Sequence, residues 1–122
     1  MLTIAVGGLA KDEIANLIKE TGGEKVEAII KSDLDAAMMV KNGQAQLYIG
    51  ACHTGGGGSL AMPLALLGRG KCMTIAIGGK ELDADNIACA VKDGIIAFGL
   101  VTQMVNQYVP IIVKAAIENL GE

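Results

Sequence analysis

The 122-residue sequence predicts one domain of the three-layer α/β/α class, in which a five-stranded parallel sheet lies between two layers of helices. Short apolar runs rich in β-branched residues alternate five times with longer segments of helical periodicity. Glycine-containing turns separate most of these segments. Such alternation favours right-handed crossovers and a ligand crevice at the carboxyl ends of the strands. We expect residues 1–122 to form a single α/β domain with the flavodoxin-like (Rossmann-like) strand order 2-1-3-4-5.

The first strand and helix are indicated by a change of period. Residues 2–6 form an apolar run that is typical of a buried strand and that ends at Gly7 and Gly8. Residues 11–20 then follow helical spacing, with charged side chains on one face. The opposite face carries three apolar side chains: Ile14, Leu17 and Ile18.

The second unit begins with residues 25–31, where apolar and polar side chains alternate as in a strand near the edge of a sheet. Ser32 directly precedes a segment of helical spacing, residues 33–41, and its side chain is suited to cap that helix. Asn42 and Gly43 follow, a pair that is typical of the left-handed position after a helix.

The third strand is expected at residues 46–51, an apolar run that leads into a glycine-rich loop. A helix is expected over residues 59–67, with Ser59 as its N-cap. Pro63 falls in or just after the first turn of this helix, where a missing N–H group is tolerated.

The last two strands are expected at residues 72–77 and 95–101, with a helix over residues 83–92 between them. From Thr102 to about Leu120 the spacing is again helical. Pro110 lies inside this segment and predicts either a kink or a fresh helix start.

Charge and composition make two classes of partner poor candidates. The formal net charge is −3 and Arg69 is the only arginine, so the chain lacks the basic stripe that nucleic-acid binding requires. The uncharged residues 44–68 include four consecutive glycines, which are unsuited to a lipid-facing helix. We therefore expect neither nucleic-acid binding nor membrane insertion.

The cysteines indicate the compartment. Cys52, Cys72 and Cys89 form no CxxC pair, and the chain has one histidine, so we expect no metal site and no cofactor. Reduced thiols fit the cytoplasm. The sequence begins without a basic region or a cleavable apolar segment, so we expect no secretion signal.

Mean hydropathy is +0.47, which is high for a small monomer. Excess apolar surface is commonly buried between subunits, so a homo-oligomer is expected.

The candidate site is the loop after the third expected strand. Glycines leave backbone N–H groups unobstructed, and a helix start adds further N–H groups and the positive end of the helix dipole. We therefore expect a small anionic metabolite, carrying a phosphate or a carboxylate, to bind there. In the expected strand order the first glycine turn borders the same cavity. The candidate chemical residues are Cys52 and His53, and the candidate anion-binding residues are Thr54, Gly55, Gly56, Gly57, Gly58, Ser59, Gly7 and Gly8.

The segment from Cys52 to Ser59 resembles the C-G-T-G-x-G-x-S signature of the type B pentose-phosphate isomerases and the related galactose-phosphate isomerase subunits. The resemblance implies that Cys52 is the base that moves a proton between two sugar carbons, and that the amides of residues 54–59 hold the enediolate oxygen. A thiol among such amides is expected to ionise near neutral pH.

The chain departs from the isomerase pattern at three places. The Asp-His pair that follows the first strand in that family is replaced by Gly7, Gly8 and Leu9. The arginines that bind the substrate phosphate have no counterpart apart from Arg69. His53 stands where that family has a glycine, and it could hydrogen-bond a ligand or tether the turn.

Over nearly its full length the chain resembles the YhfU-like proteins, an uncharacterised bacterial family. The shared features include Gly8-Leu9 and the Tyr48-to-Cys52 segment followed by Thr54-Gly55. The loop is also similar to the cysteine loop of sugar phosphotransferase IIB components, which carry phosphate on a thiol. The alternatives to an isomerase-like enzyme are therefore a ligand-sensing or assembly subunit without chemistry, and a phosphocarrier.

Overall fold

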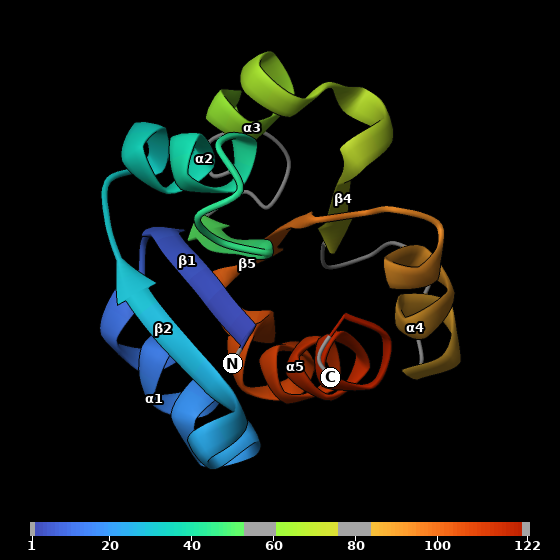
Figure 1. The fold of residues 1–122 in the computed structure, drawn as a ribbon. Coiled ribbons are helices and arrows are strands. Elements are labelled where there is room, and N and C mark those ends of the chain that lie inside the picture. The colour runs from blue at the N-terminus through green and yellow to red at the C-terminus, as the bar shows by residue number, and fades with distance from the viewer. Residues whose placement is uncertain (1, 53–60, 76–83, 121–122) are drawn as a thin grey trace.

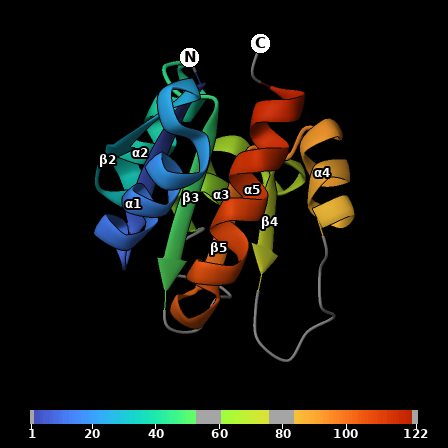
Figure 2. The same cartoon turned by 90° about the horizontal axis from the view of Figure 1, so that it is seen from below.

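The protein, in a computed structural model that describes residues 2–52, 61–75 and 84–120, is a three-layer α/β/α structure (Figure 1). A single five-stranded sheet forms the middle layer, and each of its strand pairs is parallel. Helices α2 and α3 cover one face of the sheet, while α1, α4 and α5 cover the other (Figures 1 and 2). The predicted fold class is confirmed.

Every strand and helix expected from the sequence has a counterpart among the described residues. The strands are β1 (Leu2–Gly8), β2 (Val26–Ile30), β3 (Leu47–Cys52), β4 (Cys72–Ile75) and β5 (Ala97–Val101). The helices are α1 (Lys11–Gly22), α2 (Asp33–Lys41), α3 (Ala61–Leu67), α4 (Ala84–Lys92) and α5 (Val105–Asn119). Short 3-10 turns are η1 (Gly23–Lys25), η3 (Arg69–Lys71) and η4 (Thr102–Met104). None of the described helices has the length and apolar character needed to cross a membrane.

The predicted order of the last two strands is wrong. The observed order is β2-β1-β3-β5-β4, so β5 lies beside β3 and β4 forms the edge. Every residue of β5 is buried, whereas in β4 Thr74 is exposed and only Ile75 is buried. An interior strand needs apolar side chains on both faces, and β5 meets this requirement better than β4. The prediction that the second strand lies near an edge is confirmed.

The helix ends follow local chemistry. The Ser32 hydroxyl oxygen accepts a hydrogen bond of 3.1 Å from the backbone N–H of Asp35, which confirms the predicted cap of α2. Gly43 has a φ of +79°, as expected after that helix. Pro110 lies inside α5, which begins after the η4 turn and continues past the proline. The predicted cap Ser59 lies outside the described residues.

The two faces of the sheet are packed differently. The face under α1, α4 and α5 carries large side chains such as Ile49, Phe98 and Leu100. The face under α2 carries smaller ones, with Ala5 and Ala97 beside Tyr48. Because side chains alternate along a strand, residues 48, 50 and 52 of β3 all belong to this second face.

A row of glycines on the α2 face makes room for one aromatic ring. Gly7, Gly50 and Gly99 are in register on β1, β3 and β5. A Cβ atom at Gly50 would lie 2.5 Å from the Tyr48 hydroxyl oxygen, and one at Gly7 would lie 3.0 Å from the same oxygen. The side chain of Tyr48 therefore lies over Gly7 and Gly50 and is fully buried. Its hydroxyl is directed toward the carboxyl ends of β1 and β3.

Candidate functional site

The carboxyl ends of β1 and β3 meet, as the sequence predicted. Cys52 is the last residue of β3 and is half-buried. Gly8, at the end of β1, pairs with Ala51, the residue directly before Cys52. The backbone N–H of Leu9 donates to the Ala51 carbonyl oxygen at 2.7 Å, which fastens the two strand ends together.

The other predicted loop residues follow Cys52 in the sequence. His53, Thr54, Gly55, Gly56, Gly57, Gly58 and Ser59 all lie outside the described residues. The described part of the candidate site is therefore the carboxyl ends of β1 and β3.

A carboxylate lies at the same carboxyl ends of the strands. Asp33 is the first residue of α2, and its Oδ1 accepts a hydrogen bond of 2.5 Å from the backbone N–H of Gly8. This contact joins the start of α2 to the end of β1. It also engages the Gly8 amide within the protein, so this predicted anion donor already has an acceptor.

The Tyr48 hydroxyl lies close to Asp33. A Cβ atom at Gly7 would be 3.0 Å from the Tyr48 hydroxyl oxygen and 3.1 Å from Asp33 Oδ1, so both oxygens lie around one point. Burial raises the pKa of Tyr48 well above its ordinary value, and the nearby acidic groups of Asp33, Cys52 and Cys72 raise it further. The phenol therefore stays protonated at neutral pH.

We call Asp33, Tyr48 and Cys52 the edge cluster. Each comes from the α2 side of the sheet, and together they place a carboxylate, a neutral phenol and a thiol near the carboxyl ends of β1 and β3. Of these, the sequence predicted a role only for Cys52. The two-residue spacing of Tyr48, Gly50 and Cys52 was a sequence signal for Tyr48, because alternation puts all three residues on one strand face. The glycine between them leaves room for the aromatic ring beside the thiol. Asp33 became visible only through its contact with Gly8.

Replacing Tyr48 by phenylalanine is expected to make stability less sensitive to alkaline pH. Because the native phenol has a raised pKa, the unfolded chain releases the proton first as the pH rises through 10.0. The stabilisation that the neutral phenol gives the folded state is complete below that pH. Above it, the free energy of unfolding of the wild type falls by up to about 1.4 kcal/mol per pH unit. Urea unfolding of both proteins between about pH 8 and about pH 11 measures the difference.

The thiol of Cys72 also makes stability depend on alkaline pH, and it does so in both proteins. Burial raises the pKa of Cys72 from 9.0, so it also reduces stability at alkaline pH. Since Cys72 is present in wild type and variant, the difference between their pH slopes reports on Tyr48. Identical slopes would contradict the raised pKa.

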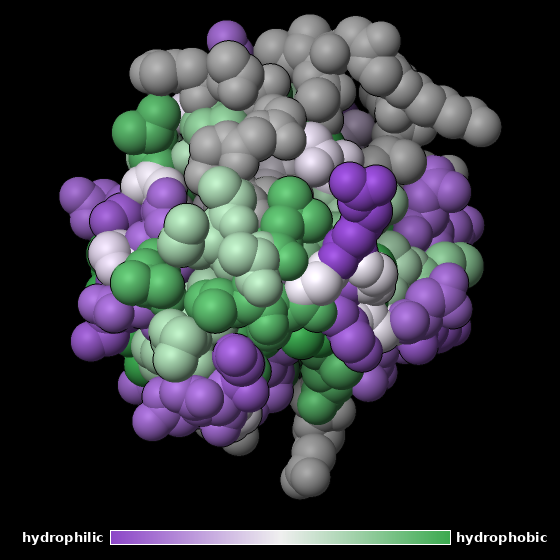
Figure 3. All heavy atoms as spheres, turned by 90° about the horizontal axis from the view of Figure 1, so that it is seen from above, coloured by the Kyte–Doolittle hydropathy of each residue, from purple (hydrophilic) through white to green (hydrophobic). Residues whose placement is uncertain are grey.

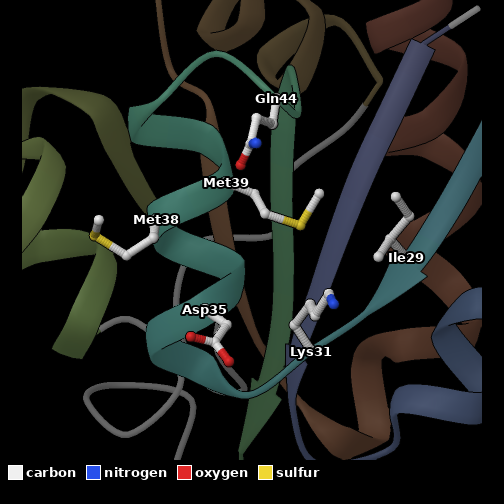
Figure 4. Close-up of a pocket in the computed structure, with 6 residues that line it drawn as sticks. All are labelled: Ile29, Lys31, Asp35, Met38, Met39 and Gln44. Carbon is white, nitrogen blue, oxygen red and sulfur yellow. The ribbon is translucent and has the colours of Figure 1, made fainter.

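Two hollows lie away from the edge cluster. A groove of about 440 Å³ between α2 and the edge strand β2 is lined by Ile29, Lys31, Asp35, Met38, Met39 and Gln44 (Figure 4). A hollow of about 360 Å³ between α4 and α5 is lined by Asp85, Ala88, Ile111, Lys114, Ala115 and Glu118. Neither lining includes a cysteine. Within residues 2–52, 61–75 and 84–120, no group of three or more His, Cys, Asp or Glu side chains is arranged to hold a metal ion.

Comparison of the sequence with known proteins gives matches over almost its full length. The model of a family described as "Protein of unknown function DUF2620" matches residues 2–116. The uncharacterized protein YhfU of Escherichia coli strain K12 is 38% identical over 114 residues, which cover 93% of this chain and 97% of that protein. The YhfU protein of Shigella flexneri matches with the same values. The predicted resemblance to YhfU-like proteins is confirmed.

Comparison of the structure gives type B ribose 5-phosphate isomerases. The enzyme of Thermotoga maritima has a TM-score of 0.69 at 15% identity, and the match covers 97% of this chain and 87% of that one. The enzyme of Trypanosoma brucei has a TM-score of 0.64 at 18% identity, covering 94% and 85%. At such identities the likeness establishes a shared fold.

Proposed function

Because this chain belongs to the DUF2620 family, which is defined without a function, we propose a function from its own site: it binds a small anionic metabolite, a sugar phosphate or a carboxylate, at the carboxyl edge of the sheet. We further propose that Cys52 transfers a proton between adjacent carbons of that metabolite, as in a sugar-phosphate isomerase. Cys52, Cys72 and Cys89 are thiols rather than disulfides, which suits the reducing cytoplasm as the location.

The observation that carries the proposal is the position of Cys52. It ends a central strand, at the edge where parallel α/β sheets bind ligands, and four glycines follow it within the next six residues. The isomerases whose fold the chain shares give independent support for this reaction class. The loop amides of residues 54–59 are the proposed anion donors, since the Gly8 amide is bonded to Asp33.

The proposed step balances without a cofactor. The Cys52 thiolate takes the proton from the carbon next to the substrate carbonyl, so that a C–H bond breaks and an S–H bond forms. The released electron pair makes a carbon–carbon double bond, and the carbonyl oxygen becomes the negative oxygen of an enediolate. Backbone N–H groups would stabilise that oxygen. The hydroxyl proton of the neighbouring carbon then passes to this oxygen, which moves the negative charge to the second oxygen. As the second oxygen forms the new carbonyl, the double-bond pair takes the proton back from Cys52 at the former carbonyl carbon, and the thiolate is regenerated.

Proton exchange in heavy water tests the proposal without knowledge of the exact substrate. The protein is incubated in D₂O with ribose 5-phosphate and, separately, with aldohexose 6-phosphates, and the carbon-bound proton next to the carbonyl is followed by NMR. We expect this proton to be replaced by deuterium faster than in buffer. Binding without exchange would favour the ligand-sensing alternative, whereas absence of both would contradict the proposal for these compounds.

A further inference from the structure

Helix α3 is apolar on all of its sides. Its seven residues, Ala61–Leu67, include no charged or polar side chain. Only Pro63 is buried in the protein, while Met62 and Leu64 are 36% and 37% exposed. A helix without a polar face is normally covered by other protein. The exposed part of α3 therefore requires a partner surface.

The neighbouring helix extends this apolar surface. Helices α2 and α3 pack side by side over the same face of the sheet. Leu34, in the first turn of α2, is 50% exposed, and Met38 follows one turn later on the side toward α3 (Figure 4). Figure 3 shows hydrophobic side chains gathered across this side of the molecule. We call the exposed part of Leu34, Met38, Ala61, Met62, Leu64 and Ala65 the α2–α3 face.

The charges around the α2–α3 face are arranged by helix direction. Both helices connect parallel strands and so run opposite to them. The exposed Asp35 lies in the first turn of α2, and the exposed Lys41 lies in its last turn. Two further exposed cations, Arg69 and Lys71, follow the end of α3. Within and directly after the helices, the charge is therefore acidic in the first turn of α2 and basic at the ends of both helices.

We propose that the α2–α3 face is the interface between two copies of this chain, related by a two-fold axis that sets their α2 helices antiparallel. A two-fold interface must be complementary to itself. The antiparallel arrangement places Asp35 of each copy opposite the partner's Lys41, whereas a parallel arrangement would place like charges together. The apolar residues between these charges supply the driving force of association. A second copy is thus the occupant that fits both the hydrophobicity and the charge order.

A charged side chain introduced into the α2–α3 face tests whether that face is buried in a dimer. In sedimentation equilibrium the wild-type chain is expected to be a dimer, and Leu64→Glu is expected to weaken the dimer at least about 100-fold. Leu120→Glu is the matched control, because Leu120 is also 37% exposed but lies at the end of α5, on the other side of the sheet. Circular dichroism confirms that both variants fold. A monomeric wild type, or equal effects of the two substitutions, would overturn the proposal.

A charge exchange tests the antiparallel arrangement. Asp35→Lys and Lys41→Asp each place like charges opposite one another at two symmetric positions, and each is expected to weaken the dimer about tenfold. The double variant restores opposite charges and is expected to return to near wild-type affinity. The cap of α2 is retained throughout, since it uses the backbone N–H of residue 35. A double variant as weak as the sum of the single ones would overturn the arrangement.

Discussion

Cys52→Ala is expected to slow the exchange of the substrate proton by at least about 1,000-fold, while the affinity for the same sugar phosphate changes by less than about threefold. The substitution removes the proposed base and leaves the backbone amides of the loop in place. Cys52 is half-buried at the end of β3, and alanine fits there without a clash. Deuterium exchange by NMR gives the rate, and titration calorimetry gives the affinity.

Cys89→Ala is the matched control for this experiment. Cys89 is an exposed cysteine on α4, on the opposite face of the sheet from the edge cluster. We expect wild-type exchange in this variant. If Cys52→Ala retains its exchange rate, Cys52 is not the base, and a loss of binding together with exchange would instead indicate that the thiol holds the ligand.

Gly8→Ala is expected to lower the free energy of unfolding by about 3 kcal/mol or more. Gly8 has a φ of +73°, which L-residues rarely adopt, and the new Cβ would collide with the carbonyl oxygen of Ala51. That oxygen also accepts the hydrogen bond from Leu9, so neither strand end can move aside without losing it. Urea unfolding followed by circular dichroism measures the change.

Gly43→Ala separates the cost of backbone strain from the cost of a steric collision. Gly43 has a similar φ of +79°, but a Cβ there would meet nothing within 4 Å. We expect this substitution to cost about 1 kcal/mol, which is the backbone contribution alone. Equal losses in the two variants would show that the junction of β1 and β3 tolerates a side chain, and that the close approach beside Cys52 is not a constraint.

Local patterns predicted most elements of this fold to within two residues. Helix α2 illustrates the reason. The Ser32 side chain caps its start and the Gly43 backbone follows its end, and each acts within one helical turn of its own position. These residues themselves therefore specify both ends of the helix. The same holds for the strands, whose apolar residues report burial directly. Cys52 was found because it stands where a strand gives way to glycines.

Contacts distant in sequence were not predictable in this way. Asp33 and Gly8 are 25 residues apart, and nothing near either one indicates that the first residue of a helix will bond the end of β1. Tyr48 shares a strand face with Gly50 and Cys52 by local alternation, but its placement over Gly7 depends on strand register. Two members of the edge cluster therefore emerged only from the structure.

The sequence by itself determined the α/β class, the helix and strand positions, and the thiol at the end of β3. The tertiary structure decided which of two apolar strands entered the middle of the sheet, and it joined α2 to β1 through Asp33. The physical reason is that hydrogen-bond capping and side-chain periodicity act over a few residues. The choice between β4 and β5 depends instead on how much apolar surface each buries against helices from elsewhere in the chain.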